Sequence, residues 1–148
     1  MHVLLPSTTE LLIRNDIAQL AILSEAMERI GIEHGLAQKP LYELQVALDE
    51  MVSNVIKYAW PDGGAHEIRV RITVSSGQVT IVIVDDGTPF DPLDAPPPRS
   101  APPGQRPRPG GLGIHLVKQF IDKIEHARIG GWNYLTLTKQ CEVGVQHQ

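Results

Sequence analysis

The chain has 148 residues, of which 42% are hydrophobic and 20% charged, and its formal net charge at pH 7 is −4. This length fits one domain that buries a core without help from disulfides or metals. A single cysteine, Cys141, excludes a disulfide framework and a zinc site built from several cysteines. The acidic balance argues against a dedicated nucleic-acid binder, whose surface would be basic.

Hydropathy gives two expectations about location. The most apolar stretch in the middle of the chain, residues 79–84, is too short to cross a bilayer. Residues 6–10 (PSTTE) interrupt the chain before the apolar segment of a secretory signal could form. We therefore expect one cytoplasmic domain that spans residues 1–148 and has neither a membrane nor a nucleic acid as a partner.

The first half of the chain predicts one short strand and two helices. A strand is expected near residues 2–5. Apolar residues with helical spacing predict helices over 15–30 and 40–59. The first is followed by Gly31, and the second begins with Pro40, which suits a first helical turn.

The second half predicts two hairpins separated by a loop and a helix. Strands are expected at residues 67–75 and 79–84 around a turn at 75–78, and at 125–129 and 132–139 around Gly130-Gly131. Nine of the twelve prolines lie between Pro89 and Pro109, so this stretch forms neither a helix nor an inner strand. A helix over 112–124 follows it. These elements define an α+β fold, a two-layer sandwich in which three helices cover one face of a mostly antiparallel sheet.

A polar line runs along the second predicted helix. Glu50 and Asn54 stand four residues apart and share a face, and Lys57 and Tyr58 continue it one turn later. The apolar residues occupy the adjacent face, so we expect the polar line to lie clear of the core. A carboxylate, an amide oxygen and an ammonium suit a base, a magnesium ligand and a phosphate contact. Taken alone, the spacing also fits a solvated helix face.

The strand at 79–84 is followed by Asp85, Asp86 and Gly87. A carboxylate at the end of a strand can accept a hydrogen bond from an exocyclic amine such as that of adenine. Glycine lets the backbone approach a flat ring closely. A plain turn is the alternative, because aspartate and glycine are common turn residues.

Glycines open the last predicted helix. A helix N-terminus with unblocked N–H groups is an anion site. The absence of a parallel βαβ unit separates this cluster from a dinucleotide fingerprint. Arginines in the preceding loop could reach phosphates or keep the loop soluble. The glycines are Gly110, Gly111 and Gly113, and the arginines are Arg99, Arg106 and Arg108.

Taken together, the order of these motifs resembles that of the histidine-kinase-like ATPase superfamily, which has the Bergerat ATP-binding fold. Glu50-x-x-x-Asn54 with Lys57 is similar to its N box, and Asp85-x-Gly87 to its adenine box. Gly111-x-Gly113-x-x-Leu116 is similar to its glycine box, with residues 91–110 as a proline-rich ATP lid. The tracts DDGTPFDP and GGLGIHLV resemble the small anti-sigma-factor serine kinases most.

The resemblance implies a role for each matched residue. Glu50 would be the general base, Asn54 would hold Mg²⁺, and Asp85 would bind adenine. Lys57 would touch a phosphate and Tyr58 would line the nucleotide pocket. The nucleotide-binding set that the resemblance implies consists of Asn54, Lys57, Tyr58, Asp85, Gly87, Arg106, Arg108, Gly111, Leu112, Gly113 and Leu116.

The activity that the resemblance implies is that of a Mg-ATP-dependent serine/threonine-protein kinase. Such a kinase acts as an anti-sigma factor and phosphorylates an anti-sigma-factor antagonist in a partner-switching module, with a sigma factor as second partner and a homodimer as its assembly. Glu50 favours this branch over histidine kinases, which usually carry asparagine there, because a hydroxyl nucleophile gains from a base. A water nucleophile gains equally. An ATP-binding switch without significant kinase activity and a stand-alone ATPase therefore remain alternatives.

Three residues depart from the pattern or invite other roles. Pro89 stands where many superfamily members have a second glycine of the adenine box. His115, inside the last predicted helix, is interpreted as a packed or surface histidine. Cys141 is interpreted as an inert thiol, because no partner motif lies beside it.

Overall fold

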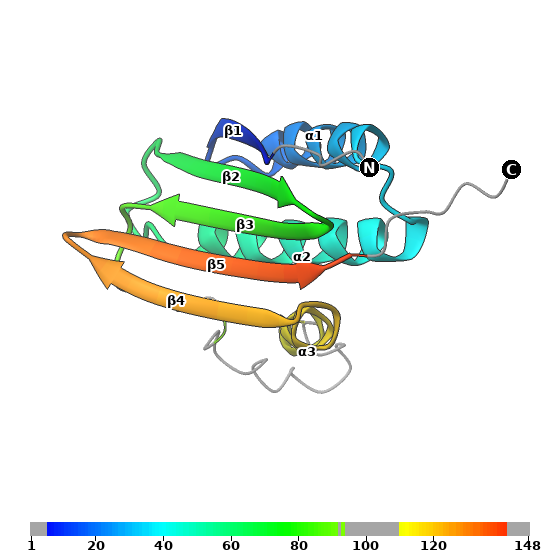
Figure 1. Ribbon diagram of the computed structural model, residues 1–148. Helices are drawn as coiled ribbons and strands as arrows, with labels where there is room; N and C mark the ends of the chain where they lie inside the picture. The colour runs from blue at the N-terminus through cyan, green and yellow to red at the C-terminus, as the bar shows by residue number, and fades with distance from the viewer. Residues whose placement is uncertain (1–5, 92, 94–109, 142–148) are drawn as a thin grey trace, which may run out of the picture.

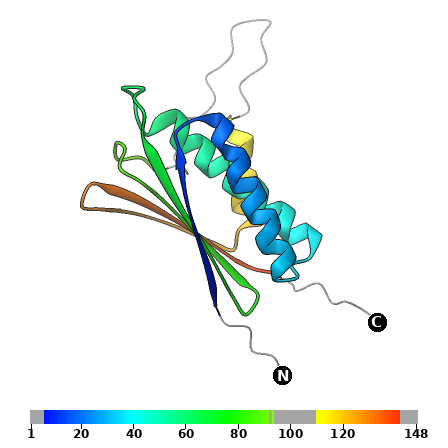
Figure 2. The same ribbon diagram turned by 90° about the horizontal axis from the view of Figure 1, so that it is seen from above.

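The structure, a computed structural model, describes residues 6–91, 93 and 110–141, with the side chains of residues 110–112 outside the description. These residues form two layers, a twisted antiparallel sheet and a layer of helices on one of its faces (Figures 1 and 2). The five strands lie in the order β1-β2-β3-β5-β4. The expected α+β sandwich is confirmed.

The elements follow one another in a simple order. The first half contains β1 (Ser7–Arg14), the 3-10 turn η1 (Ile17–Gln19), α1 (Leu20–Glu33) and α2 (Gln38–Tyr58). The second half contains β2 (Glu67–Ser75), β3 (Gln78–Asp85), α3 (Gly110–Phe120), β4 (Lys123–Ile129) and β5 (Trp132–Gln140). None of the helices in the described part of the chain is long and apolar enough to span a membrane.

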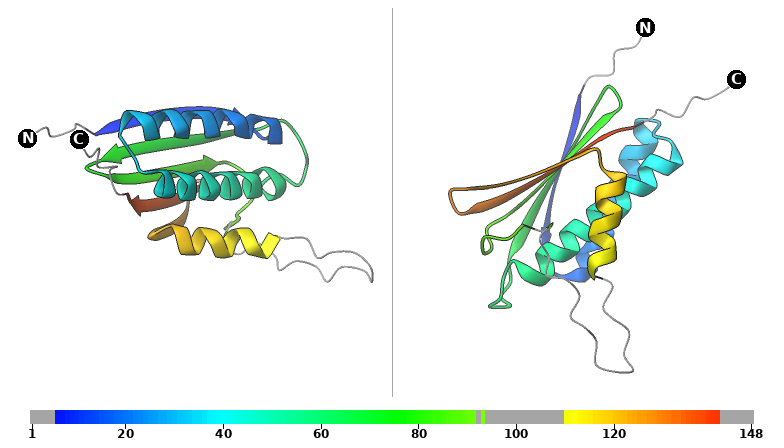
Figure 3. Two further views of the ribbon diagram at one scale, coloured as in Figure 1. Left: turned by 90° about the vertical axis from the view of Figure 1, so that its right-hand side faces the viewer. Right: turned by 90° about the horizontal axis from the view of Figure 1, so that it is seen from below.

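The core lies between the two layers. The three helices run across one face of the sheet with α2 in the middle, where it contacts both α1 and α3 (Figure 3). In the sheet, alternate residues point toward the helices, as the period of a strand requires. The largest wholly buried side chains on α2 and on the strands beneath it are Leu44, Leu48, Met51, Val52, Ile68, Ile72, Ile81, Ile83 and Leu137.

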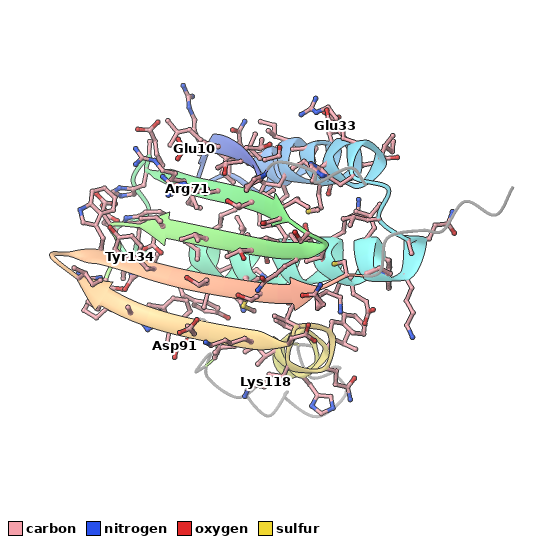
Figure 4. The ribbon with its side chains drawn as sticks, viewed as in Figure 1. Glu10, Glu33, Arg71, Asp91, Lys118 and Tyr134 are labelled. Carbon is pink, nitrogen blue, oxygen red and sulfur yellow. The ribbon has the colours of Figure 1, made fainter. Side chains whose placement is uncertain are left out.

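The opposite face of the sheet is covered by no element of the described chain. Its side chains are half-buried or exposed, and Glu10 of β1 and Arg71 of β2 form an ion pair on it (Figure 4). A hollow of about 540 Å³ lies at one end of this face, with His66, Arg69, Trp132 and Tyr134 among its lining residues.

The start of the chain differs from the expectation. The strand expected near residues 2–5 lies outside the described residues, whereas Ser7–Arg14, for which we expected no strand, forms β1 and pairs with β2. The first helix does not begin at residue 15. Asp16 accepts a hydrogen bond from the Ala18 backbone N–H at 3.0 Å and caps η1, so that α1 starts only at Leu20.

The last helix is shorter than expected. It was predicted to reach residue 124, but α3 ends at Phe120 and Ile124 lies in β4 opposite Leu137. Ile124 therefore reaches the core from a strand, although its spacing from Phe120 and Ile121 also fits a helix. The Lys139 ammonium donates to the Phe120 carbonyl oxygen at 2.5 Å and satisfies the C-terminal end of α3.

The hairpin turn at 75–78 is confirmed. Ser76 and Gly77 both have positive φ angles, 51° and 79°, as a tight hairpin turn requires. Of the proline-rich stretch at 91–110, only residues 91, 93 and 110 are described, so the expected lid lies almost wholly outside the described residues.

Candidate nucleotide site

The polar line of α2 is more buried than we expected. Glu50 is half-buried, and Asn54 is only 6% exposed. Within the described residues the Asn54 amide nitrogen is buried and has no hydrogen-bond partner. The expectation that this line lies clear of the core is wrong at Asn54. A buried amide without a hydrogen-bond partner costs free energy, so contact with water does not account for an asparagine at position 54.

Lys57 and Tyr58 continue the line at the exposed end of α2. Lys57 lies in its last turn, with no ion pair to another described residue. Tyr58 is 41% exposed and packs its ring against that of Phe90, with the ring centres 5.5 Å apart. The Tyr58 side chain therefore lies beside the segment that follows β3.

Glu50 meets the beginning of α3. A β-carbon on Gly113 would overlap the Glu50 carboxylate, so this carboxylate lies directly against the helix backbone. The helix begins at Gly110, and its glycines form the first turn of the helix rather than precede it. Gly111 and Leu112 belong to the same turn. Leu116, 38% exposed, faces away from the core, which Ile114 and Val117 contact instead.

Asp85 ends β3 as a buried carboxylate, 3% exposed. Its Oδ1 atom accepts hydrogen bonds from the Gly87 backbone N–H and from Asn133 Nδ2, both at 2.9 Å. Burial raises the pKa of Asp85, and the nearby Asp86 raises it further. The two hydrogen bonds and the charge of Arg128 oppose this shift.

The turn after Asp85, residues 86–88, packs against the end of α2; we call it the Asp85 turn. The carbonyl oxygen of Ala59 accepts from the Thr88 backbone N–H at 2.8 Å and from the Thr88 hydroxyl at 3.2 Å. A β-carbon at Gly87 would lie 2.5 Å from the same carbonyl oxygen. We expected Gly87 to let the backbone approach a flat ring; the close approach that the structure shows at Gly87 is instead to Ala59, directly after α2.

Two functional candidates were not found from the sequence. Asn133 of β5 and Arg128 of β4 lie opposite each other in the sheet, and both contact the Asp85 turn. A signal for Asn133 existed: it occupies an inward position in a strand whose other inward residues are apolar or, at Lys139, cap a helix. No comparable signal marks Arg128.

The structure therefore brings Glu50 to Gly113, and the Asp85 turn to the end of α2. Arg106 and Arg108 lie outside the described residues. Two hollows among the described residues, of about 540 and 390 Å³, do not include Glu50, Asn54 or Asp85 in their lining. Cys141 is buried, and burial raises the pKa of its thiol to about 11, so the thiol stays protonated at neutral pH.

A strand-end carboxylate, a polar helix face and a glycine-led helix are the features expected of a nucleotide-binding ATPase domain. The comparison with protein families agrees, since residues 13–139 match the histidine kinase-like ATPase domain. The chain belongs to this family. The resemblance drawn from its motifs is confirmed, and membership implies that it binds ATP.

Several similar curated proteins are protein kinases. Over 112 residues the chain is 29% identical to the serine/threonine-protein kinase BtrW of Bordetella bronchiseptica, covering 76% of this chain and 79% of that protein. It is 25% identical over 130 residues to the serine-protein kinase RsbW of Halalkalibacterium halodurans, covering 84% and 78%. These relatives belong to the class of enzyme that we expected from the sequence, the serine/threonine-protein kinases.

Two solved structures share the fold. One contains the RsbU and RsbW domains of a protein from Mycobacterium tuberculosis (TM-score 0.65, 14% identity), and the match covers 91% of this chain and 32% of that one. The other is the histidine kinase domain of a blue-light activated histidine kinase from Erythrobacter litoralis (TM-score 0.51, 18% identity, covering 84% and 60%).

Proposed function

We propose that this chain is a Mg-ATP-dependent serine/threonine-protein kinase that acts as an anti-sigma factor and phosphorylates an anti-sigma-factor antagonist. The observation that carries the proposal is the position of Glu50. Its carboxylate lies against the first turn of α3, one helical turn from the buried Asn54 amide. A base beside a helix N-terminus can act on a hydroxyl that attacks a phosphoryl group held there.

In the proposed reaction a serine or threonine oxygen of the antagonist forms a bond to the γ-phosphorus of ATP. The bond from that phosphorus to the bridging oxygen breaks, and ADP leaves. Glu50 takes the hydroxyl proton. The backbone N–H groups of the first turn of α3, from Gly110 to Gly113, would bind phosphate oxygens.

The remaining residues would bind the nucleotide and a metal ion. Asn54 would hold Mg²⁺ through its amide oxygen, the kind of ligand that magnesium takes. Its buried amide nitrogen, which has no partner among the described residues, would then donate to a phosphate oxygen. When bound, Mg²⁺ neutralises charge on the phosphates. Asp85 would accept from the adenine amino group. Lys57 would contact a phosphate, and Tyr58 would line the pocket beside Phe90.

The partner proposal rests on likeness to the RsbW and BtrW kinases. We infer that the antagonist is the phosphate acceptor, that a sigma factor is the second partner, and that the chain works in the cytoplasm as a homodimer. Light scattering of the purified chain, alone and with each candidate partner, measures the assembly directly.

Substituting Glu50 by glutamine tests the kinase proposal. We expect E50Q to bind ATP within about twofold of wild type, because the side chain keeps its size, while transfer to the antagonist falls by roughly 10²–10⁴-fold with loss of the base. Radiolabelled ATP measures transfer, and calorimetry measures binding. Glu33→Gln on the exposed side of α1 is the matched control (Figure 4).

Four outcomes would contradict parts of the proposal. Unchanged transfer by E50Q would remove Glu50 as the base. Release of free phosphate without transfer to any protein would identify an ATPase, and nucleotide-dependent partner binding without either reaction would identify a switch. Unchanged Mg-ATP affinity in both Asn54→Ala and Asp85→Asn would overturn the site itself.

A further inference from the structure

Asn133 uses its whole side chain inside the protein. Its Nδ2 atom donates to Asp85 Oδ1 and to the Thr88 carbonyl oxygen, both at 2.9 Å. Its Oδ1 atom accepts from Arg128 Nη1 at 3.1 Å. Both amide hydrogens are therefore taken, and no donor is left for a ligand. Asn133 can influence a bound nucleotide only through the groups that it holds.

Arg128 fixes which way this amide points. A guanidinium only donates, so the amide oxygen must face Arg128, and the amide nitrogen must then face the two acceptors on the other side. Arg128 Nη1 also donates to the Gly87 carbonyl oxygen at 2.7 Å. Arg128, Asn133 and Asp85 thus form one chain of hydrogen bonds from β4 through β5 to β3.

The end of this chain determines how Asp85 is presented. Oδ1 accepts from both Asn133 and the Gly87 N–H, which together use its acceptor capacity. Within the described part of the chain no hydrogen bond reaches Oδ2. One carboxylate oxygen is therefore fixed by the fold, and the other is left as an acceptor for a ligand.

We propose that Arg128 and Asn133 are positioning residues that hold Asp85 with Oδ2 as a ligand acceptor and thereby make the site selective for a purine with an amino group at C6. The proposal rests on the proposed nucleotide binding. A purine with a carbonyl at C6 places an acceptor against Oδ2 and gains no hydrogen bond there. Selectivity between the two purines therefore reports the presentation of Asp85.

The test compares ADP with inosine diphosphate, which carries the C6 carbonyl, by calorimetry in the presence of Mg²⁺. We expect wild type to prefer ADP and Asn133→Ala to lose roughly tenfold or more in ADP affinity, with little change for inosine diphosphate. Arg128→Gln, at an exposed position, should show a smaller loss of the same kind. It is the second variant if Asn133→Ala folds poorly.

The pH dependence of ADP binding gives a second readout. The charged groups that act on Asp85 are Asp86, which raises its pKa, and Arg128, which lowers it together with the Asn133 hydrogen bond. Removing Asn133 or Arg128 therefore raises the pKa of Asp85 further. The pH below which ADP binding is lost should move upward in both variants, and Arg128→Lys, which keeps the charge, should restore part of the shift.

Asn15→Ala is the matched control. The Asn15 amide also bridges two backbone groups, donating to the Gly64 carbonyl oxygen and accepting from the His66 N–H, both at 2.8 Å, but it makes no hydrogen bond to Asp85, Asn133 or Arg128. It should lower the melting temperature and leave selectivity and pH dependence unchanged.

Two results would overturn the proposal in different ways. If Asn133→Ala weakened both nucleotides in equal proportion and kept the wild-type pH midpoint, the positioning role alone would fail. If the wild-type chain bound no ADP at millimolar concentration, the proposed function would fail and this proposal with it.

Discussion

At the scale of single residues, Asp85 shows that binding groups cost stability. Its pKa is raised by burial, so the folded chain holds the proton more tightly than the unfolded chain does. The free energy of unfolding therefore falls as the pH rises from the ordinary aspartate pKa through the raised one. The cost is complete only at a pH above the raised pKa.

Asp85→Asn should remove the cost and keep the packing. The amide oxygen of asparagine can still accept from Asn133 Nδ2 and the Gly87 N–H. At pH 7 we expect a melting temperature equal to or a few degrees above wild type, where 1 kcal/mol corresponds to about 2–4 °C, together with loss of ADP binding. Thermal unfolding at pH 4 and pH 7 measures the effect, with the exposed Asp49→Asn as control. A variant clearly less stable than wild type at pH 7 would argue against the buried-charge account.

Sequence reasoning found Asp85 but not the residues that hold it. An aspartate after an apolar strand is a local pattern, readable within a few positions. Asn133 is 48 positions away, and its partnership depends on β5 pairing with β3 in the register that sets Asp85 opposite Asn133. Neither the neighbouring strand nor that register follows from local spacing.

At the scale of elements, two glycines hold the site together in different ways. At Gly87 a β-carbon would press on the backbone of Ala59, which cannot move without shifting α2. At Gly113 it would press on the carboxyl end of Glu50, which can rotate away. The same substitution should therefore have different consequences in the two places.

Gly87→Ala should destabilise the fold by about 1–3 kcal/mol, because the Asp85 turn must separate from α2. Gly113→Ala should leave stability unchanged or raise it by up to about 1 kcal/mol, because alanine favours a helix, while displacement of Glu50 slows phosphoryl transfer. Chemical denaturation and the transfer assay separate the two effects. Equal losses of stability would contradict the contrast between the two contacts.

The elements themselves were predictable where the hydrophobic period was clear. α2 and the β2–β3 hairpin lie close to their predicted positions, since each has one apolar face over its whole length. β1 was missed because two of its inward residues, Ser7 and Thr9, are polar, and because residues 11–13 are all apolar and so hide the alternation of a strand. The end of α3 was misplaced because Ile124 satisfies the helical and the strand pattern at once.

At the scale of the whole molecule, stability comes from one core between the helices and the sheet. Met51 lies at its centre on α2 and is wholly buried. Met51→Ala should lower the free energy of unfolding by about 2–5 kcal/mol, a large share of the 5–15 kcal/mol that is usual for a domain. Urea denaturation should show a lower midpoint with an unchanged slope. A loss below about 1 kcal/mol would show that the layers repack around the gap.

The two-layer architecture followed from the sequence, because segregated helices and hairpins leave few other arrangements. The strand order did not follow. It places β5 between β3 and β4 and so inserts the last strand beside the Asp85 strand. That arrangement, which no local pattern indicates, lets β4 and β5 contribute Arg128 and Asn133 to the site.

The two tryptophans of the chain have contrasting surroundings. Trp60 is 8% exposed, stacks on His66 and donates its indole N–H to Asp86 at 3.3 Å, whereas Trp132 is 44% exposed. A buried indole emits at shorter wavelength than a solvated one. With Trp132 replaced by phenylalanine, the remaining tryptophan emission comes from a ring that is hydrogen-bonded to Asp86, the neighbour of Asp85. The chain thus carries an optical reporter of its own strand-end turn, and no attached dye is needed to observe that turn.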